Sequence, residues 1–245
     1  MSGHSKWANI KRKKGANDAV RGKITTKIGR EITVAVQMGG SDPVGNMRLK
    51  LALSKAKANN IPKENIQRAI KKGLGAADGS SYDELRYEGY GPGGVAVMLD
   101  IMTDNRNRTA ADIRHMFSKH GGNLGETGCV GWMFKQKAVF VVDKEVFSDE
   151  DELMNIVLEA GAEDMKSEDE VFEITAEPND FEAIANALGE KGIETMSAEV
   201  TMVPDTTVKL EGKDADKMLN LVEDLEEHDD VQNVYANYDI DEAEE

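Results

Sequence analysis

The chain has 245 residues, of which 40% are hydrophobic and 31% charged, and its formal net charge is −16. This length allows one large domain or two to three smaller ones with real cores. No apolar run approaches the roughly 18 residues of a membrane helix, and the amino terminus is charged where a signal peptide is apolar. We therefore expect a cytoplasmic protein with no membrane partner. The single cysteine, Cys129, allows no internal disulfide and has no spacing partner for zinc.

The charges are divided unevenly along the chain. Residues 1–75 carry 17 Lys or Arg and 4 Asp or Glu, whereas residues 139–245 carry 6 and 34. Within residues 2–30 there are nine Lys or Arg and one acidic residue, Asp18. One end of the chain therefore suits polyanions and the other repels them.

The amino-terminal part predicts a small basic helical domain. Residues 1–17 are polar and basic, contain Trp7 and lack an apolar period, which predicts an arm that is loosely ordered until it meets a partner. Apolar residues recur at helical spacing over residues 18–38, and a second helix is indicated around residues 49–57. A third begins at Pro62 and ends at Gly73. We expect this three-helix domain to occupy residues 1–77, with 76–81 as the linker that follows it.

After the linker the pattern alternates between strands and helices. Strands are predicted at 94–101 and 129–135 around a helix at 104–120, and residues 138–203 have a complete β-α-β-β-α-β order. Residues 206–238 again read as strand, helix and strand. The predicted fold class is α+β, with a basic three-helix N-terminal domain plus two ferredoxin-like (βαββαβ) modules, one inserted in the other. The outer module would be discontinuous, over residues 78–136 and 205–245, and the inserted one would span 137–204.

Cys129 lies beside one of these predicted strands. Val130, Trp132 and Phe134 alternate in the way a half-buried strand does. We therefore interpret Cys129 as a small structural residue rather than a nucleophile.

The first candidate site is the basic arm together with the first helix. Phosphate neutralisation needs several cations in one footprint, and an aromatic ring can stack on an unpaired base. The alternatives are a solubilising face or a docking surface for the protein's own acidic lobe. The candidate nucleic-acid contacts are His4, Lys6, Trp7, Lys11, Arg12, Lys13, Lys14, Arg21, Lys23, Lys27 and Arg30.

The remaining candidates are weaker. The glycine-rich run at 87–94 leads into a strand and lacks the phosphate-loop order, so we interpret it as a tight turn. The polar run at 104–109 lies at a helix start, where capping alone explains its amides. Seven residues here are possible cavity or partner contacts: Tyr90, Gly91, Gly93, Gly94, Asn105, Arg106 and Arg108. Because no nucleophile, base and orienter occur together, we expect no catalytic residues, and His115 and His120 have the wrong spacing for a metal site, so we expect no metal and no cofactor.

Several runs resemble the YebC family of bacterial and organellar regulators. They include GHSKWANIKRKKGANDAVRGK, NNIPKENIQRAIKKG, YEGYGPGG and DNRNRTAADIRHMFSKHGGNLG, and the likeness extends through most of residues 3–135. The resemblance implies a helical domain and two α+β domains, one inserted in the other, around a central cavity, without enzymatic activity. It also implies nucleic-acid contacts at the basic residues of 6–14 and 21–30. Residues 91–94 and 106–108 would line the cavity.

Three functions remain open. Some members of the YebC family, which this chain resembles, are described as DNA-binding transcriptional regulators, and other members act on ribosomal synthesis. No helix displays Asn, Gln and Arg arrayed for base edges, so DNA affinity would come mostly from phosphates. A translation factor would use the arm on ribosomal or transfer RNA, because Trp7 suits irregular RNA, and on the ribosome it would relieve stalled synthesis. An enzyme acting in the cavity is the least favoured, and we expect a monomer.

Overall fold

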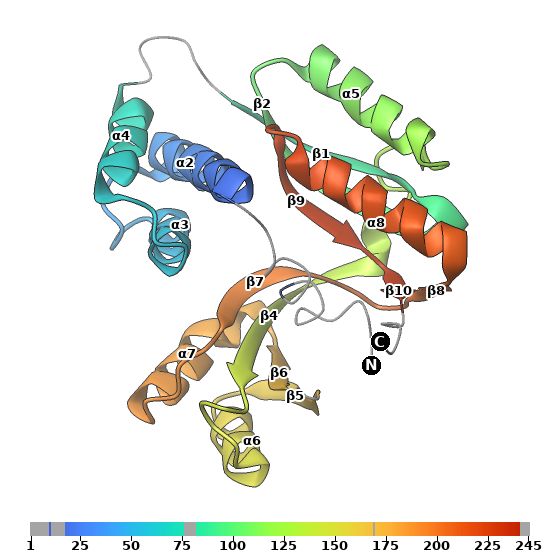
Figure 1. Cartoon of the computed structure of the whole chain (residues 1–245). Helices are drawn as coiled ribbons and strands as arrows, with labels where there is room; N and C mark the ends of the chain where they lie inside the picture. Colours follow the sequence, from blue (N-terminus) through green and yellow to red (C-terminus); the bar gives the residue numbers. More distant parts are fainter. Residues whose placement is uncertain (1–9, 11–17, 76–81, 169, 241–245) are drawn as a thin grey trace.

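The computed structural model describes residues 10, 18–75, 82–168 and 170–240. The predicted arm, apart from Ile10, and the predicted linker at 76–81 lie outside the described residues. No helix in the described part of the chain is both long and apolar enough to cross a membrane. The elements form a helical body and two sheet-based bodies (Figure 1).

Three helices make up the amino-terminal body, as the apolar spacing predicted. They are α2 (Asp18–Gly39), α3 (Met47–Ala58) and α4 (Lys63–Leu74). Ile28, Ile32 and Ala35 of α2 are at most 3% exposed and pack with residues of α3 and α4. A Cβ at Gly73 would lie 2.7 Å from the Cβ of Val36, so the close packing of α4 on α2 requires glycine at this position.

The inserted module has the predicted βαββαβ order. Its elements are β4 (Phe134–Asp143), α6 (Glu150–Glu159), β5 (Ala162–Ser167), β6 (Val171–Ala176), α7 (Phe181–Glu190) and β7 (Ser197–Pro204). The strands form an antiparallel sheet in the order β5-β6-β4-β7. One core cluster joins this sheet to α6 and α7, with Phe140, Leu153 and Ile184 fully buried.

The outer module is assembled from two segments on either side of the insert. Its elements are β1 (Asp83–Tyr90), β2 (Ala96–Thr103), α5 (Arg106–Lys119), β3 (Asn123–Leu124), β8 (Val208–Leu210), α8 (Gly212–Glu227), β9 (Val231–Ala236) and β10 (Tyr238–Ile240). The antiparallel sheet has the order β3-β1-β2-β9, with α5 and α8 on one face (Figure 1). β8 and β10 form a separate parallel pair. The α+β fold class with one module inserted in the other is therefore confirmed, although β1 pairs with β2 as a hairpin that precedes α5.

Two local predictions were wrong. Residues 87–90 belong to strand β1, and only Pro92–Gly94 form the predicted turn. The predicted strand over 129–135 is instead a 3-10 turn at Gly131–Met133 followed by the start of β4. Val130 and Phe134 are buried as expected, but Trp132 is 71% exposed.

The buried carboxylate of Glu88 explains this turn. It is 4% exposed and accepts the backbone N–H groups of Gly128 at 2.5 Å and Val130 at 3.1 Å, as well as that of Gly131. These N–H groups satisfy the acceptor and are therefore not available for a strand ladder.

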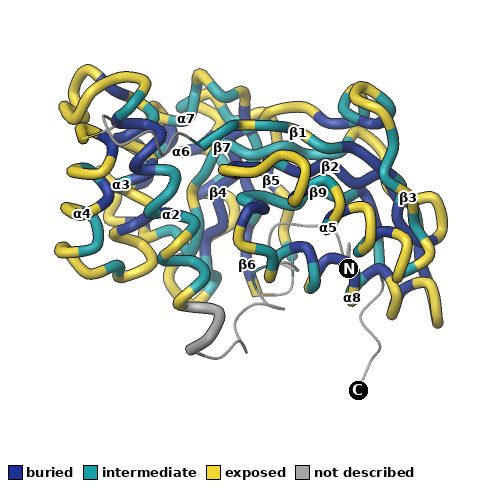
Figure 2. The backbone as a smooth tube through the Cα atoms, turned by 90° about the horizontal axis from the view of Figure 1, so that it is seen from above, coloured by how far each residue is buried: buried dark blue, intermediate teal, exposed yellow. Residues whose placement is uncertain are grey.

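Each of the three bodies has an apolar core of its own. A smaller apolar cluster joins the two modules, in which Ala96 and Met98 of β2 pack with Val130 and with Phe134 of β4. Figure 2 shows the helical body at one end and the outer sheet at the other, each with its own buried interior. The predicted domain limits, 1–77, 137–204 and the two outer segments, stay a prediction.

Candidate nucleic-acid interface

Most of the predicted arm contacts cannot be located. His4, Lys6, Trp7 and residues 11–14 lie outside the described residues, and Arg21 belongs to α2 with a side chain that is likewise outside the description. Their role in nucleic-acid binding stays a prediction. Lys23, Lys27 and Arg30, further along α2, are described, and we call these three residues the paired face.

The paired face contacts the protein's own acidic residues. Lys23 donates to the backbone oxygen of Glu227 at 2.7 Å, and Lys27 donates to that of Glu226. Arg30 donates to the backbone oxygens of Met102 at 3.0 Å and Asp229 at 2.9 Å. Met102 belongs to β2, and the other acceptors lie at the carboxyl end of α8 and in the loop before β9. The helical body therefore docks on the outer module through α2. The paired face thus forms the docking surface for the protein's own acidic residues that the sequence analysis raised as an alternative.

Asp230 is the most deeply buried partner of this interface. Its carboxylate accepts hydrogen bonds from Arg30 at 2.8 Å, Arg108 at 3.0 Å and Thr109 at 2.8 Å. The side chains of Asp230 and Arg30 are 4% and 16% exposed. Burial alone would raise the pKa of Asp230, but the hydrogen bonds from Arg30, Arg108 and Thr109 outweigh it and lower the pKa to about 2. The carboxylate is therefore fixed in its charged form.

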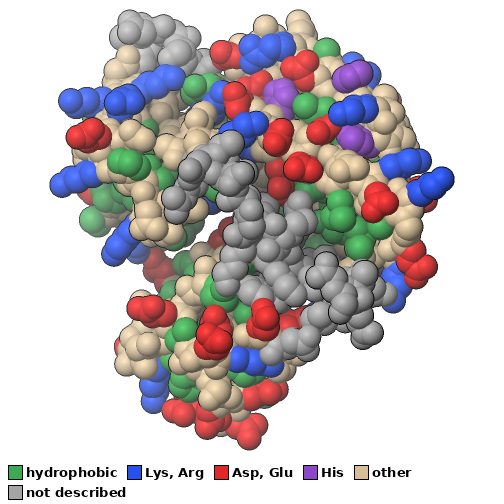
Figure 3. Space-filling view, viewed as in Figure 1, with side chains coloured by type: hydrophobic (Ala, Val, Ile, Leu, Met, Phe, Trp, Pro, Cys, Tyr) green, Lys and Arg blue, Asp and Glu red, His purple; other side chains and the backbone are tan. Residues whose placement is uncertain are grey.

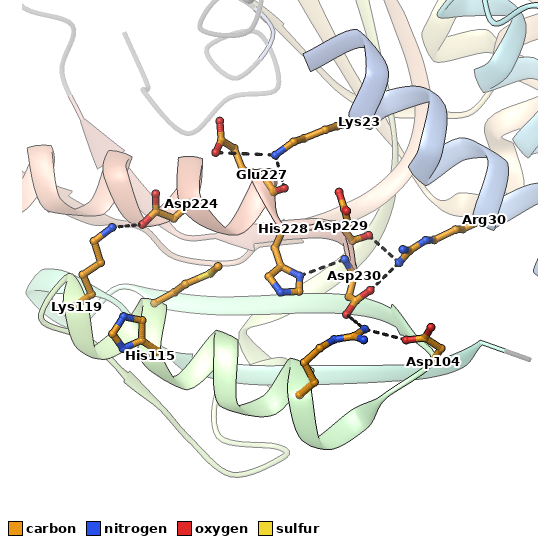
Figure 4. A pocket seen from close by; sticks show the side chains of 12 residues that line it. Lys23, Arg30, Asp104, His115, Lys119, Asp224, Glu227, His228, Asp229 and Asp230 are labelled. Atoms are coloured by element: carbon orange, nitrogen blue, oxygen red, sulfur yellow. Dashed lines mark hydrogen bonds and ion pairs between the residues drawn. The ribbon is translucent and has the colours of Figure 1, made fainter. Parts of the chain in front are cut away.

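A cleft of 840 Å³ lies where α2, α5 and α8 meet. Figure 4 shows Lys23 and Arg30 reaching from α2 toward Glu227, Asp229 and Asp230, with Lys119 of α5 directed at Asp224 of α8. The lining combines both signs of charge and contains His115 and His228. Its cations are engaged by neighbouring carboxylates or carbonyls, so the cleft in this state has little free positive charge for an anion.

The other predicted cavity or partner residues lie in different surroundings. Arg108 lines the cleft, and Asn105 caps α5 by accepting the N–H of Arg108 at 3.1 Å. Arg106 pairs with Asp83 at 2.8 Å on the surface. The hydroxyl group of Tyr90 donates to the oxygen of Cys129 at 3.2 Å.

The glycine-rich turn packs against the helix and strand that follow the insert. A Cβ at Gly91 would lie 2.6 Å from the Sδ of Met218, and one at Gly93 would clash with the side chain of Leu210. Gly93 and Gly94 also have positive φ angles of 69° and 79°. Close packing and backbone conformation thus account for these glycines, and a role as cavity lining stays a prediction.

A second basic surface, which the sequence analysis left out of its candidate site, lies on α3 and α4. We call it the free face, because its members are exposed and their side chains form no hydrogen bond or ion pair with the residues that the structure describes. They are Lys55, Lys57, Lys63, Arg68 and Lys71. Residues 47–75 contain a single acidic residue, Glu64. Figure 3 shows Lys and Arg side chains along the outer edge of the helical body, whereas Asp and Glu gather on the inserted module.

The titratable groups elsewhere do not form a reactive set. Burial, together with the nearby Glu88, raises the pKa of the Cys129 thiol, which disfavours the nucleophilic thiolate. His120 contacts Asp224 at 2.7 Å, and Lys119 shares the same carboxylate oxygen. Among the described residues, His, Cys, Asp and Glu form no group of three or more that could hold a metal ion.

Comparison with known proteins covers almost the whole chain. Residues 5–76 match the TACO1/YebC protein N-terminal domain, and residues 82–238 match the TACO1/YebC second and third domain. A protein of Pelotomaculum thermopropionicum is 59% identical over 98% of this chain and 99% of its own length, and one of Desulforamulus reducens is 57% identical with the same coverage. Both are named "probable transcriptional regulatory protein". The crystal structure of a conserved hypothetical protein from Aquifex aeolicus is 45% identical, with a TM-score of 0.86 over 98% of each chain.

Proposed function

Since the chain belongs to the TACO1/YebC family, as its sequence motifs predicted, we propose that it is a cytoplasmic, non-enzymatic regulator of gene expression that binds nucleic acid through the free face. The observation that carries this proposal is the cluster of five exposed cations on α3 and α4 without a partner among the described residues. Cations that are already solvated and unpaired neutralise phosphates without first breaking an internal contact. The arm, with its further basic residues, would extend the same footprint.

Duplex DNA is the first candidate ligand. The names of the relatives support a role in transcription. The free face consists of four lysines and one arginine, which suits contacts with phosphates more than bidentate contacts with base edges. We therefore expect binding with weak sequence preference and strong dependence on salt.

RNA is the second candidate, because its backbone offers the same phosphates. The salt dependence separates the two ligands. Five phosphate contacts predict a slope of log K against log salt of about −4.5 on duplex DNA and about −3.5 on single-stranded RNA. The better ligand at equal length and physiological salt would decide between a transcriptional and a translational role.

The experiment that tests the proposal is binding of a 20-base-pair duplex and a 20-nucleotide RNA to a charge-reversed chain. The variant changes Lys55, Lys57, Lys63 and Lys71 to Glu, and we expect a loss of affinity of about 100-fold or more. The matched control changes Lys166, Lys191, Lys213 and Lys217 to Glu; these residues are exposed, lie on the α+β modules and give the same change in net charge. Equal loss of affinity in the two variants would contradict the proposed site.

A further inference from the structure

The acceptors that meet the paired face resemble a row of phosphate oxygens. Apart from the backbone oxygen of Met102, they are the backbone oxygens of Glu226, Glu227 and Asp229 and the carboxylate of Asp230. We call residues 226–230 the acidic end of α8. The last carbonyls of a helix have no partner within the helix and carry the negative end of its dipole. The side chain of Glu227 adds a further charge 3.9 Å from Lys23. The paired face thus binds an array of oxygens that other anions could replace.

The contact between the helical body and the rest of the protein depends on these charges. Two further ion pairs run in the same direction, from Arg48 to Glu84 at 2.5 Å and from Lys50 to Glu182 at 2.8 Å, so the helical body supplies the cations and the two modules supply the anions. Among the described residues, no apolar cluster joins α2–α4 to the two modules, and Ile10 of the arm packs beside Val141 and Val171 of the inserted module. An interface of this kind weakens when counterions or a polyanion compete for its charges.

We propose that the acidic end of α8 occupies the paired face in place of nucleic acid, and that bound nucleic-acid phosphates displace it, so that Lys23, Lys27 and Arg30 become a second phosphate-binding strip. This inference rests on the proposed function. Phosphates held on the free face would raise the local concentration of anions beside α2, which belongs to the same three-helix body. Displacement of Asp230 would also leave Arg108, on the opposite wall of the cleft, with Asp104 at 2.8 Å as its remaining carboxylate partner.

Removal of one charge from the acidic end of α8 tests the proposal. Asp230→Asn weakens the hold on Arg30, and we expect it to bind the 20-base-pair duplex about tenfold more tightly than the wild-type chain, because the competing anion is lost. The matched control is Asp224→Asn, which removes the same charge from α8 at a carboxylate that contacts Lys119 and His120 of α5. Near-ultraviolet circular dichroism checks that the Asp230→Asn chain is folded. If the folded variant binds the duplex no more tightly than the Asp224→Asn chain, the proposal is wrong.

The distance between α3 and α5 gives a second measurement that does not depend on that substitution. Spin labels at Ser54→Cys and Ser118→Cys, both exposed positions, in a Cys129→Ser chain report how far the helical body lies from the outer module. We expect the distance to lengthen when duplex DNA or RNA is added at saturation. Nucleic acid that binds with the distance unchanged would overturn the displacement and leave the proposed function intact.

The same labels separate the two proposals when no nucleic acid binds. In that case the proposed function fails, and displacement by phosphates fails with it. If the distance still lengthens between 50 mM and 1 M NaCl, the docking of the helical body depends on charge even though nucleic acid does not displace it. A constant distance would contradict charge-dependent docking as well.

Discussion

The paired face on α2 and the free face on α3 and α4 belong to one three-helix body and carry the same kinds of side chain. Arg30 is 16% exposed and donates three hydrogen bonds to the outer module. Arg68, on α4, is exposed and contacts no described acceptor. The difference comes from the acidic end of α8, which reaches α2 and not α4. A count of basic residues therefore overestimates the surface that is ready for an external polyanion.

The largest expected effect comes from removing one arginine from each face. Arg30→Ala should lower the free energy of unfolding by about 3 kcal/mol, because it leaves the buried carboxylate of Asp230 with one of its two arginine partners lost. Arg68→Ala should change it by less than about 0.5 kcal/mol. Urea denaturation of both chains measures the difference. Equal stability of the two variants would show that the two faces are not distinct.

The second largest effect is expected from acid, which should lower the stability of the protein by protonating Asp230 at the paired face. The pKa of Asp230 is lowered from 3.8 to about 2 in the folded protein, so its stabilising contribution is complete above the unfolded value and is lost as the pH falls from about 4 toward 2. The expected loss is about 2 kcal/mol. Urea midpoints at pH 5, 4, 3 and 2 measure this loss, and the Arg30→Ala chain should show a smaller decrease over the same range.

A single substitution on the free face should have a smaller effect, seen in affinity and not in stability. Lys63→Gln removes one phosphate contact and should make the salt slope on duplex DNA less steep by about 0.9. Between 50 and 200 mM salt the wild-type chain should therefore lose about threefold more affinity than the variant. Lys166→Gln in β5 serves as the control and should leave the slope unchanged; the same change of slope in both chains would place the contact elsewhere.

The smallest effect is expected for an exposed ion pair between the bodies. Lys50 and Glu182 are 2.8 Å apart, but their side chains are 55% and 56% exposed. Solvent screens such a pair, so Lys50→Ala should cost less than about 0.5 kcal/mol in unfolding free energy. A cost near that of Arg30→Ala would mean that exposed and buried ion pairs contribute equally to the docking.

Local sequence patterns predicted most of the fold. The helical spacing of apolar residues over 18–38 predicted α2, and the β-α-β-β-α-β pattern over 138–203 predicted the order of elements in the inserted module. The exposed Trp132 was not predictable from its neighbours, because the turn beneath it is fixed by Glu88, more than 40 residues earlier in the chain. Contacts between residues so far apart in the sequence cannot be predicted from the local hydrophobic periodicity.

The candidate site shows the same division between near and distant contacts. The sequence identified the basic end of the chain and raised self-docking as an alternative for its cations. It could not tell which cations are engaged, because Arg30 meets Asp230 across 200 positions of the chain. The free face was present in the sequence as Lys55, Lys57, Lys63, Arg68 and Lys71. Its only distinguishing feature, the lack of a partner among the described residues, appears once the chain is folded.

The most direct test compares both faces in one measurement, the reactivity of each lysine toward an acetylating ester with and without a saturating 20-base-pair duplex. In the free protein, Lys23 and Lys27 should react more slowly than the free-face lysines, because their Nζ atoms donate to carbonyls of α8. The duplex should then protect Lys55, Lys57, Lys63 and Lys71. Free-face lysines that stay fully reactive while the duplex is bound, or protection confined to the α+β modules, would contradict the central claim that nucleic acid binds on α3 and α4.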